Sequence, residues 1–481
     1  MDWLTKLSQF WPHLAAGFDF LAALFASCHA LLHKRDSRAA TLWLGVIWLM
    51  PVLGPLLYLA LGVNRIRRRA LTLGVHSTTQ SRIPRNLGDR EHEGAEHLKH
   101  LARVVSRVVT RSLTAGNLVQ PLVNGDEAFP VMLESIRLAH KSISLCTYIF
   151  DNDASGKQFA DALGQAVKRG VAVRVLIDAA GTRYSWPAIT HRLKALGIPY
   201  ARFLPASLFT PWRLAMLNLR NHRKIMVVDG HTAFTGGMNI RRGNVLAARP
   251  PSPVQDLHFR VEGPVVTQLQ DAFVNDCAFT TGEVLDDEVW FSNPPLHHRG
   301  VVARVITDGP DADFEKLRWT LLAALAEAQT SVRIITPYFL PDPALVAALN
   351  LAALRGVRVD IILPGQSNLP YVHWASRAMW WQVLENGCRI WLTPPPFDHS
   401  KLMVVDGHWV LLGSANWDAR SLRLNFELNV EGYGRELAHA LEGVIAKKLQ
   451  SAHEVTQAEV DGRTIPGKLR DAAARLFSPF L

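Results

Sequence analysis

HRKIMVVDGH, residues 222–231, is repeated almost unchanged as HSKLMVVDGH, residues 399–408. Eight of the ten positions are identical in the two copies, which begin 177 residues apart. In each copy the apolar run predicts a buried β-strand that ends in an Asp-Gly turn. The repeated segment therefore indicates that one structural unit is present twice in the chain.

The duplication extends well beyond this segment. Alternating, β-rich runs at 142–150 and 331–339 are each followed by a helical stretch, a glycine and a second strand-like run. This order is typical of a βαβ unit, in which two parallel strands lie side by side. We therefore predict an α/β fold built from two tandem modules, at 119–290 and 291–481.

Two apolar runs stand at the beginning of the chain. The first, 14–32, carries one carboxylate, Asp19, and the second, 41–63, carries no charge. The second run is long enough to cross a bilayer as a helix, at roughly 20 residues per crossing, whereas the first can span or lie in the interface. We predict an N-terminal α-helical membrane hairpin over 1–69, followed by a linker over 70–118.

Positive charge accompanies the hairpin. Four arginines follow the second run, in NRIRRRA, and the loop between the runs offers three basic residues, Lys34, Arg35 and Arg38. The positive-inside rule therefore favours the cytoplasm for both ends of the hairpin and for the modules after it. The 481-residue chain has a formal net charge of +10, which favours a polyanionic partner, either nucleic acid or an anionic membrane.

The repeated segment carries residues suited to phosphoryl chemistry. His222 and Lys224 share one face of a strand, as do His399 and Lys401. Imidazole can attack an electrophile or transfer a proton, and an ammonium group stabilises negative oxygens. Because a lysine so close to the histidine would repel a cation, we expect no metal and no cofactor. Two histidines in one site would let one attack phosphorus while the other protonates the leaving alkoxide.

The spacing of these residues has a known counterpart. His-x-Lys-x4-Asp, followed by Gly-Gly or Gly-Ser and then Asn, is present twice and resembles the signature of the phospholipase D superfamily. The wider frame, with PVLGPLLYLALG, YIFDND, TGGMNI, PYFLPD and GSANWDARS, is similar to the bacterial cardiolipin synthase branch of that superfamily. The resemblance implies two phospholipase D-like α/β/α modules that form a pseudo-two-fold unit, in a protein of the bacterial inner membrane with a cytoplasmic catalytic part.

The same resemblance implies a phosphatidyltransferase that works by two displacements. One phosphatidylglycerol is attacked at phosphorus, glycerol leaves, and a phosphatidyl-histidine forms. A hydroxyl of a second phosphatidylglycerol then resolves this intermediate to cardiolipin. By analogy, His222 is the nucleophile and His399 is the acid and then the base, although the near-symmetry of the two copies leaves the reverse assignment open. Anionic membrane lipid is the expected partner, and nucleic acid is not.

Further site residues follow from the positions that match the signature. Asp229 and Asp406 belong to its catalytic set, where each is expected to brace the turn at a strand end. Asp256 and Glu427 occupy the positions of the carboxylates that orient the histidines. The residues expected to hold the phosphoryl oxygens are Lys224, Lys401, Asn239, Asn416 and Ser414.

The chain departs from the family pattern near the expected acceptor pocket. RRGN, 241–244, stands where an acidic run is usual after TGGMNI, and Asn368 stands where an aspartate is common. These departures bear on the acceptor alcohol and leave the histidines untouched. A hydrolytic phospholipase D, or a nuclease that uses the same histidines, is therefore the alternative. A binding protein with a dead site is disfavoured, because both copies of the segment are intact.

The C-terminal region is expected to be helical. RELAHALEGVIAKKLQSAHE, which begins at Arg435, and KLRDAAARLFSPFL, which begins at Lys468, both have the spacing of amphipathic helices. Such helices can pack on the second module or rest on a bilayer, and the sequence leaves both arrangements open.

Overall fold

The computed structural model describes the chain in two compact units, each of which is treated by itself. The residues described are 2–34, 37–62, 96–205, 219–298, 300–310 and 313–478. The first unit contains Met1–Thr72, and the second, which holds both copies of the repeated segment, contains Leu73–Pro205 and Leu219–Leu481.

The first unit is a helical hairpin. Helix α1 (Asp2–His33) is continuous, and its part His13–His33 is long and apolar enough to cross a membrane. The second apolar run is not one helix, so the prediction of a single helix over 41–63 is wrong. It is divided into α2 (Ser37–Leu49), α3 (Leu53–Leu57) and the π-helix η1 (Tyr58–Gly62).

The break between α2 and α3 has a local cause. Pro51 has no amide hydrogen to donate, and its ring clashes with the preceding helical turn. The next residue, Val52, has a φ of 62°, and its amide donates to the Asp19 carboxylate of α1 at 2.6 Å. Asp19, the carboxylate of the first apolar run, therefore satisfies a backbone donor that the break leaves without a helical partner.

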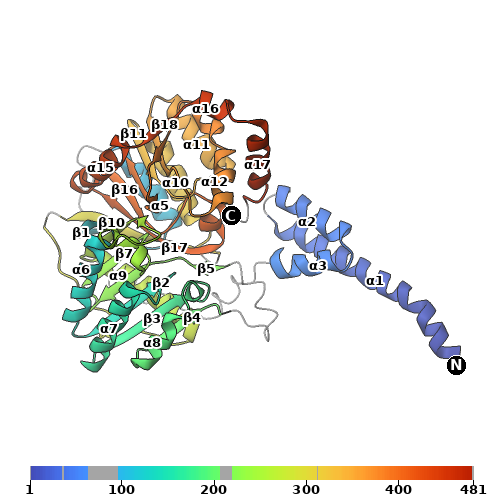
Figure 1. The fold of residues 1–481 in the computed structure, drawn as a ribbon, viewed down its shortest axis with the longest axis horizontal. Coiled ribbons are helices and arrows are strands. Elements are labelled where there is room, and N and C mark those ends of the chain that lie inside the picture. Colours follow the sequence, from blue (N-terminus) through green and yellow to red (C-terminus); the bar gives the residue numbers. More distant parts are fainter. Residues whose placement is uncertain are drawn as a thin grey trace. The chain divides into compact units, whose positions relative to one another are not determined.

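In the second unit both modules contribute to one 16-stranded sheet (Figure 1). The first module forms the half with the order β4-β3-β2-β6-β7-β9-β1, in which β2, β3 and β4 are parallel and the others pair antiparallel. These strands are β1 (Thr114–Val123), β2 (Ser142–Thr147), β3 (Ala172–Asp178), β4 (Tyr200–Phe203), β6 (Ile225–Val228), β7 (Thr232–Gly236) and β9 (Leu257–Glu262).

The second module repeats this strand order in the other half of the same sheet. From the centre outward it runs β10-β17-β16-β15-β11-β12-β13, and β18 (His453–Val455) is added at its edge. Because β1 pairs antiparallel with β10, the two halves join edge to edge, and the predicted pseudo-two-fold unit is confirmed. The strands are β10 (Val301–Asp308), β11 (Ser331–Ile335), β12 (Arg358–Pro364), β13 (Arg389–Thr393), β15 (Leu402–Val405), β16 (Trp409–Gly413) and β17 (Asn425–Tyr433).

Helices cover both faces of each half-sheet, which confirms the α/β/α architecture. One long helix packs on the strands near the centre of each half, α9 (Val265–Thr281) in the first module and α15 (Arg435–Gln450) in the second. Other helices enclose a hydrophobic core with the opposite face. They include α6 (Asn124–Leu138), α7 (Ala154–Lys168) and α8 (Ile189–Ala195) in the first module, and α10 (Lys316–Glu327) and α11 (Pro343–Leu354) in the second.

Part of the stretch expected to be a linker belongs to the folded body. Residues 98–108 form α5 (Leu98–Val108), whose Leu101 and Val105 are fully buried in the core of the second module. Residues 70–95 of the expected linker lie outside the described residues. The module boundaries at 118/119 and 290/291 stay predictions.

Candidate active site

Two short pairings between the modules position the histidines. The amide of His222 donates to the carbonyl of Phe426 at 2.9 Å, and the amide of His399 donates to the carbonyl of Gln255 at 2.8 Å. In both cases the two residues before the histidine pair in parallel with a segment of the other module. The short strands are β5 (Arg220–Asn221), which pairs with β17, and β14 (Phe397–Asp398), which pairs with β8 (Val254–Gln255).

Each imidazole is consequently hydrogen-bonded to a carboxylate of the other module. His222 Nδ1 lies 3.0 Å from both carboxylate oxygens of Glu427, and His399 Nδ1 lies 2.7 Å from Asp256 Oδ2. Both carboxylates are fully buried. Because Nδ1–H donates to a carboxylate, the tautomer of each ring is defined and Nε2 carries the reactive lone pair.

Both histidines line a single cavity of about 200 Å³. Its walls come from both modules and include Tyr148, Asn239, Arg241, Tyr338, Asn416 and Arg420. Among the residues that the structure describes, Nε2 of neither His222 nor His399 has a hydrogen-bond partner. Both imidazoles therefore border the same cavity, and the two copies of the repeated segment contribute to one site.

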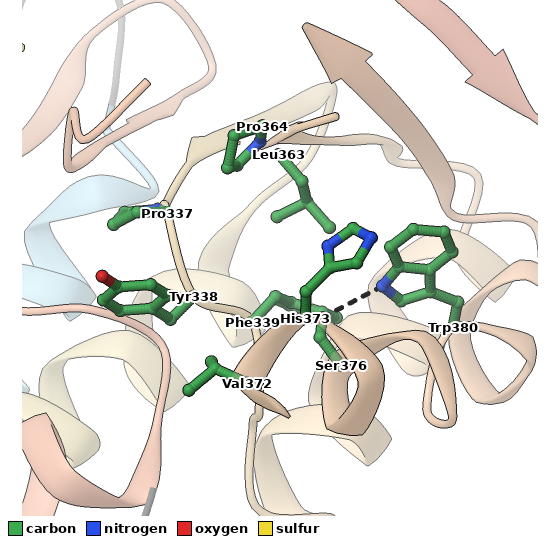
Figure 2. Close-up of a pocket in the computed structure, with 9 residues that line it drawn as sticks. All are labelled: Pro337, Tyr338, Phe339, Leu363, Pro364, Val372, His373, Ser376 and Trp380. Atoms are coloured by element: carbon green, nitrogen blue, oxygen red, sulfur yellow. Dashed lines mark hydrogen bonds between the residues drawn. The ribbon is translucent and has the colours of Figure 1, made fainter. Parts of the chain in front are cut away.

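One wall of the cavity is backed by closely packed side chains. Tyr338 and Val372 line the cavity and also line a separate space of about 10 Å³, together with His373 and Trp380 (Figure 2). A space of that size holds about one water molecule. The Trp380 indole donates to the Ser376 hydroxyl at 3.0 Å. The space behind this wall is therefore too small for anything larger than a water molecule.

Two buried lysines accompany the histidines. Lys224 Nζ donates to the carbonyl of His222 at 2.6 Å, and Lys401 Nζ donates to the carbonyl of His399. Burial lowers the pKa of Lys224 to about 7 and that of Lys401 to about 8. An anion bound in the cavity would raise both pKa values, because it favours the charged form. Neither lysine is among the residues that line the cavity, although the positive charge of each would attract a phosphodiester bound there.

Burial also governs the pKa values of the imidazoles and carboxylates. Burial, together with the charge of Lys401, lowers the pKa of His399 to about 4, and burial lowers the pKa of His222 as well. Although burial raises the pKa of Asp256 and of Glu427, the nearby cations outweigh it and bring both below their usual values. At neutral pH and before substrate binds, each imidazole is therefore neutral and each carboxylate charged, and a neutral imidazole is the nucleophilic form.

Of the three uncharged polar residues expected at the phosphate, two line the cavity. Asn239 Oδ1 accepts the Ile149 amide at 3.1 Å, which leaves the side-chain NH₂ for the cavity. Asn416 lines the cavity from the second module. Ser414 is not among the lining residues, and its hydroxyl donates to Glu427 at 2.5 Å. In this geometry Ser414 can affect a bound phosphate only indirectly, through its hydrogen bond to the Glu427 carboxylate.

The aspartates of the repeated segment hold turns together. Asp229 accepts hydrogen bonds from the amides of residues 140–142, and Asp406 accepts them from the amides of residues 329–331. Both aspartates have a positive φ, 52° and 51°. Neither lines the cavity. Each carboxylate therefore ties its own turn to the start of the first strand of the βαβ unit.

Two tyrosines contact the imidazoles, which the sequence alone did not indicate. The Tyr148 ring packs edge-on against His222, with centroids 5.2 Å apart, and Tyr338 packs likewise against His399 at 6.4 Å. Lys224 Nζ lies 5.7 Å from the centroid of the Tyr148 ring. The available signal was their position, because Tyr148 directly follows β2 and Tyr338 lies three residues after the end of the matching strand β11.

Comparison with known proteins gives a match in both modules. The family model described as "Cardiolipin synthase, PLD-like domain" matches residues 132–278 and 321–449. The chain belongs to this family. A second family model, described as "Phospholipase_D-nuclease N-terminal", matches residues 21–62, within the helical hairpin.

Named members of the cardiolipin synthase family align with nearly the whole chain. Cardiolipin synthase of Oceanobacillus iheyensis is 31% identical, over 94% of this chain and 95% of its own length. The probable cardiolipin synthase YwiE of Bacillus subtilis is 30% identical, over 95% of this chain and 92% of its own. Among solved structures, phosphatidylserine synthase of Haemophilus influenzae has a TM-score of 0.61 at 17% identity, over 79% of this chain and all of its own. That likeness supports the fold.

Proposed function

We propose that this cardiolipin synthase family member is a membrane phosphatidyltransferase that joins two molecules of phosphatidylglycerol into cardiolipin and releases glycerol. The observation that carries the proposal is the crossed pairing of His222 with Glu427 and of His399 with Asp256 around one cavity. Two oriented imidazoles with free Nε2 atoms supply a nucleophile and a proton donor for the same phosphodiester.

In the first displacement, His222 Nε2 attacks the phosphorus of one phosphatidylglycerol. The bond between phosphorus and the oxygen of the headgroup glycerol breaks. Protonated His399 gives its proton to that oxygen, so the headgroup leaves as glycerol. Glu427 stabilises the positive charge that forms on the His222 ring. Although burial lowers the pKa of His399 to about 4, a phosphodiester anion bound beside the ring favours the protonated form.

In the second displacement, neutral His399 accepts the proton of the terminal hydroxyl of a second phosphatidylglycerol. The hydroxyl oxygen attacks phosphorus, the phosphorus–nitrogen bond to His222 breaks, and cardiolipin is released. In both displacements negative charge on the phosphoryl oxygens is stabilised by hydrogen-bond donors of both modules. We assign hydrogen bonding to Asn239 and Asn416, which line the cavity, and stabilisation by positive charge to Lys224 and Lys401.

We further propose that the hairpin anchors the chain in the bacterial cytoplasmic membrane, with both modules in the cytoplasm. The support for the anchor is the apolar part of α1, His13–His33. The support for the orientation is the four arginines of NRIRRRA after the hairpin, against three basic residues in its loop.

The reaction can be tested with the purified full-length chain, phosphatidylglycerol vesicles, a chelator and a panel of alcohols, with the lipid products identified by mass. Cardiolipin together with free glycerol is the expected result. Phosphatidic acid alone would indicate a hydrolytic phospholipase D, and cleavage of DNA in a parallel assay would indicate a nuclease. A strict requirement for a divalent metal would contradict the proposed steps, which use only side chains of the protein.

A further inference from the structure

The last helix of the chain turns its large apolar side chains outward. In α17 (Ile465–Arg475), Ile465 and Leu469 are 74% and 65% exposed, and Leu476, just after the helix, is 78% exposed. These residues are four and seven positions apart, which places them on one helical face. Phe477 beside them is 62% exposed. A soluble surface rarely gathers several large apolar side chains on one helix.

The opposite side of α17 faces the protein and is small or polar. Asp471 is buried and accepts hydrogen bonds from Arg463 at 2.8 Å and from Arg470 at 2.7 Å. Ala474 packs against the apolar cluster that contains Val372. A helix that packs on a core presents its apolar side inward, and α17 does the reverse. Core packing therefore does not explain the exposed apolar face.

Positive charges border this face. Lys468 and Arg475 lie on one side of it, and Arg470 lies on the other, where its guanidinium is 4.5 Å from the centroid of the Trp374 ring. The one acidic residue of the helix, Asp471, is buried, so the exposed charges of α17 are all positive. An apolar face edged by lysine and arginine is typical of a helix that lies in the interface of an anionic bilayer.

We propose that α17 is a membrane contact separate from the hairpin, and that its exposed apolar face enters the headgroup region of an anionic bilayer. A bilayer, rather than another protein, is favoured by the positive border of the face, by the net charge of +10 and by the membrane-length apolar helix α1. The proposal does not depend on which reaction the site catalyses.

The place of α17 in the fold gives this contact a consequence for the site. α17 packs against α12 (Pro370–Arg377), at the outer edge of the second module (Figure 1). Val372 of α12 and Leu369, the residue just before α12, line the catalytic cavity. Docking of α17 would therefore bring a wall of the cavity to the bilayer surface, where the headgroups of lipid substrates lie.

A fluorescence experiment on the full-length chain tests the contact directly. Exposed Cys28 is replaced by serine, which leaves three buried cysteines, and an environment-sensitive probe is attached to Leu469→Cys. In phosphatidylglycerol vesicles that contain spin-labelled lipid, we expect the probe to be quenched. The matched control is Leu138→Cys on α6, which is 61% exposed and should stay unquenched. Equal, weak quenching at both positions would overturn the proposal, and equal quenching of the Leu469 probe in phosphatidylcholine vesicles would overturn its electrostatic part.

A kinetic comparison separates membrane contact from a structural role. We expect Leu469→Asp to lower turnover of phosphatidylglycerol in vesicles by about tenfold, because an apolar contact with the bilayer is lost. Turnover of a short-chain phosphatidylglycerol dissolved as monomers should stay unchanged, and Leu138→Asp should alter neither rate. Parallel loss on both substrates would assign Leu469 a structural role, and no loss on vesicles would contradict docking. A chain that converted phosphatidylglycerol to another product would still give the quenching result.

Discussion

His222 Nδ1 lies 3.0 Å from both carboxylate oxygens of Glu427, a residue of the other module. The pairing of His399 with Asp256 repeats this relationship in the opposite direction, at 2.7 Å. Neither module can therefore build a complete histidine–carboxylate pair alone. This interdependence gives a physical reason for the two copies of the repeated segment to lie in one chain.

The crossed pairing predicts different effects for the two carboxylates. Glu427→Gln should slow attack by His222, whereas Asp256→Asn should slow proton transfer by His399, each by about 10²- to 10⁴-fold with phosphatidylglycerol. With phosphatidyl-4-nitrophenol, whose leaving group needs little protonation, Asp256→Asn should release 4-nitrophenol in the first turnover at nearly the normal rate, and Glu427→Gln should not. Rapid-mixing measurement of the first turnover, with glycerol or 4-nitrophenol as the leaving group, separates the first displacement from the second, in which His399 acts again as base.

Asp161 provides the control for the Glu427 and Asp256 variants. Asp161, which is exposed and pairs with Arg192, should tolerate replacement by asparagine without any change in rate. If Glu427→Gln spares 4-nitrophenol release and Asp256→Asn abolishes it, the roles of the two histidines are reversed.

Asp229 should be required for stability and not for substrate binding. Asp229→Ala removes the acceptor for the amides of residues 140–142, so we expect the free energy of unfolding to fall by about 2–3 kcal/mol. The KM of correctly folded protein should stay the same. Thermal denaturation and initial rates check both effects, with Asp286→Ala, at an exposed aspartate, as the control. A tenfold change in KM with unchanged stability would instead place Asp229 at the substrate.

Lys224 should reduce stability at neutral pH. Its pKa is about 7 in the folded protein because of burial, against a usual value of 10.5, so between pH 7 and 10.5 the unfolded chain binds more protons. The contribution of Lys224 to the free energy of unfolding therefore rises with pH across that window. Lys224→Met should raise the denaturation midpoint at pH 7, and the increase should be smaller at pH 9. The same substitution should abolish activity. A lower midpoint than that of the unaltered protein at pH 7 would contradict this assignment.

Arg241 should favour an anionic acceptor. Arg241 lines the cavity, and its Nε lies 3.4 Å from Asp151 Oδ2. At the equivalent position the second module has an acidic residue, Asp418. Because a guanidinium attracts the phosphodiester of an acceptor lipid, Arg241→Gln should raise the KM for phosphatidylglycerol as acceptor by about tenfold. Transfer to a neutral alcohol should be unaffected, and Arg242→Gln, at an exposed neighbour, should change neither. Equal loss with both acceptors would contradict a role in acceptor selection.

Much of the architecture was accessible from the repeated segment. An apolar run that ends in Asp-Gly is a strong local signal, and its repetition at matching positions predicts two equivalent modules. The His-x-Lys spacing predicts that the two side chains share one face at the start of a strand. Because these signals are local, the sequence carries them without knowledge of the tertiary fold.

The pairing of histidines with carboxylates depends on contacts distant in sequence. His222 and Glu427 are brought together by β5 and β17, and β5 is only two residues long, too short to leave a periodic pattern. The hydroxyl of Ser414 likewise finds Glu427 only in the folded sheet. In the hairpin, composition predicted a single helix over the second apolar run, but the backbone chemistry of Pro51 divides it.

The two-displacement account is tested most directly by trapping the intermediate. The His399→Ala variant is incubated with phosphatidyl-4-nitrophenol and quenched within one turnover, and its peptides are analysed by mass. We expect a phosphatidyl group on His222 and none in the His222→Ala variant. Formation of product by a protein that carries no adduct, or an adduct on His399 in the His222→Ala variant alone, would contradict His222 as the nucleophile.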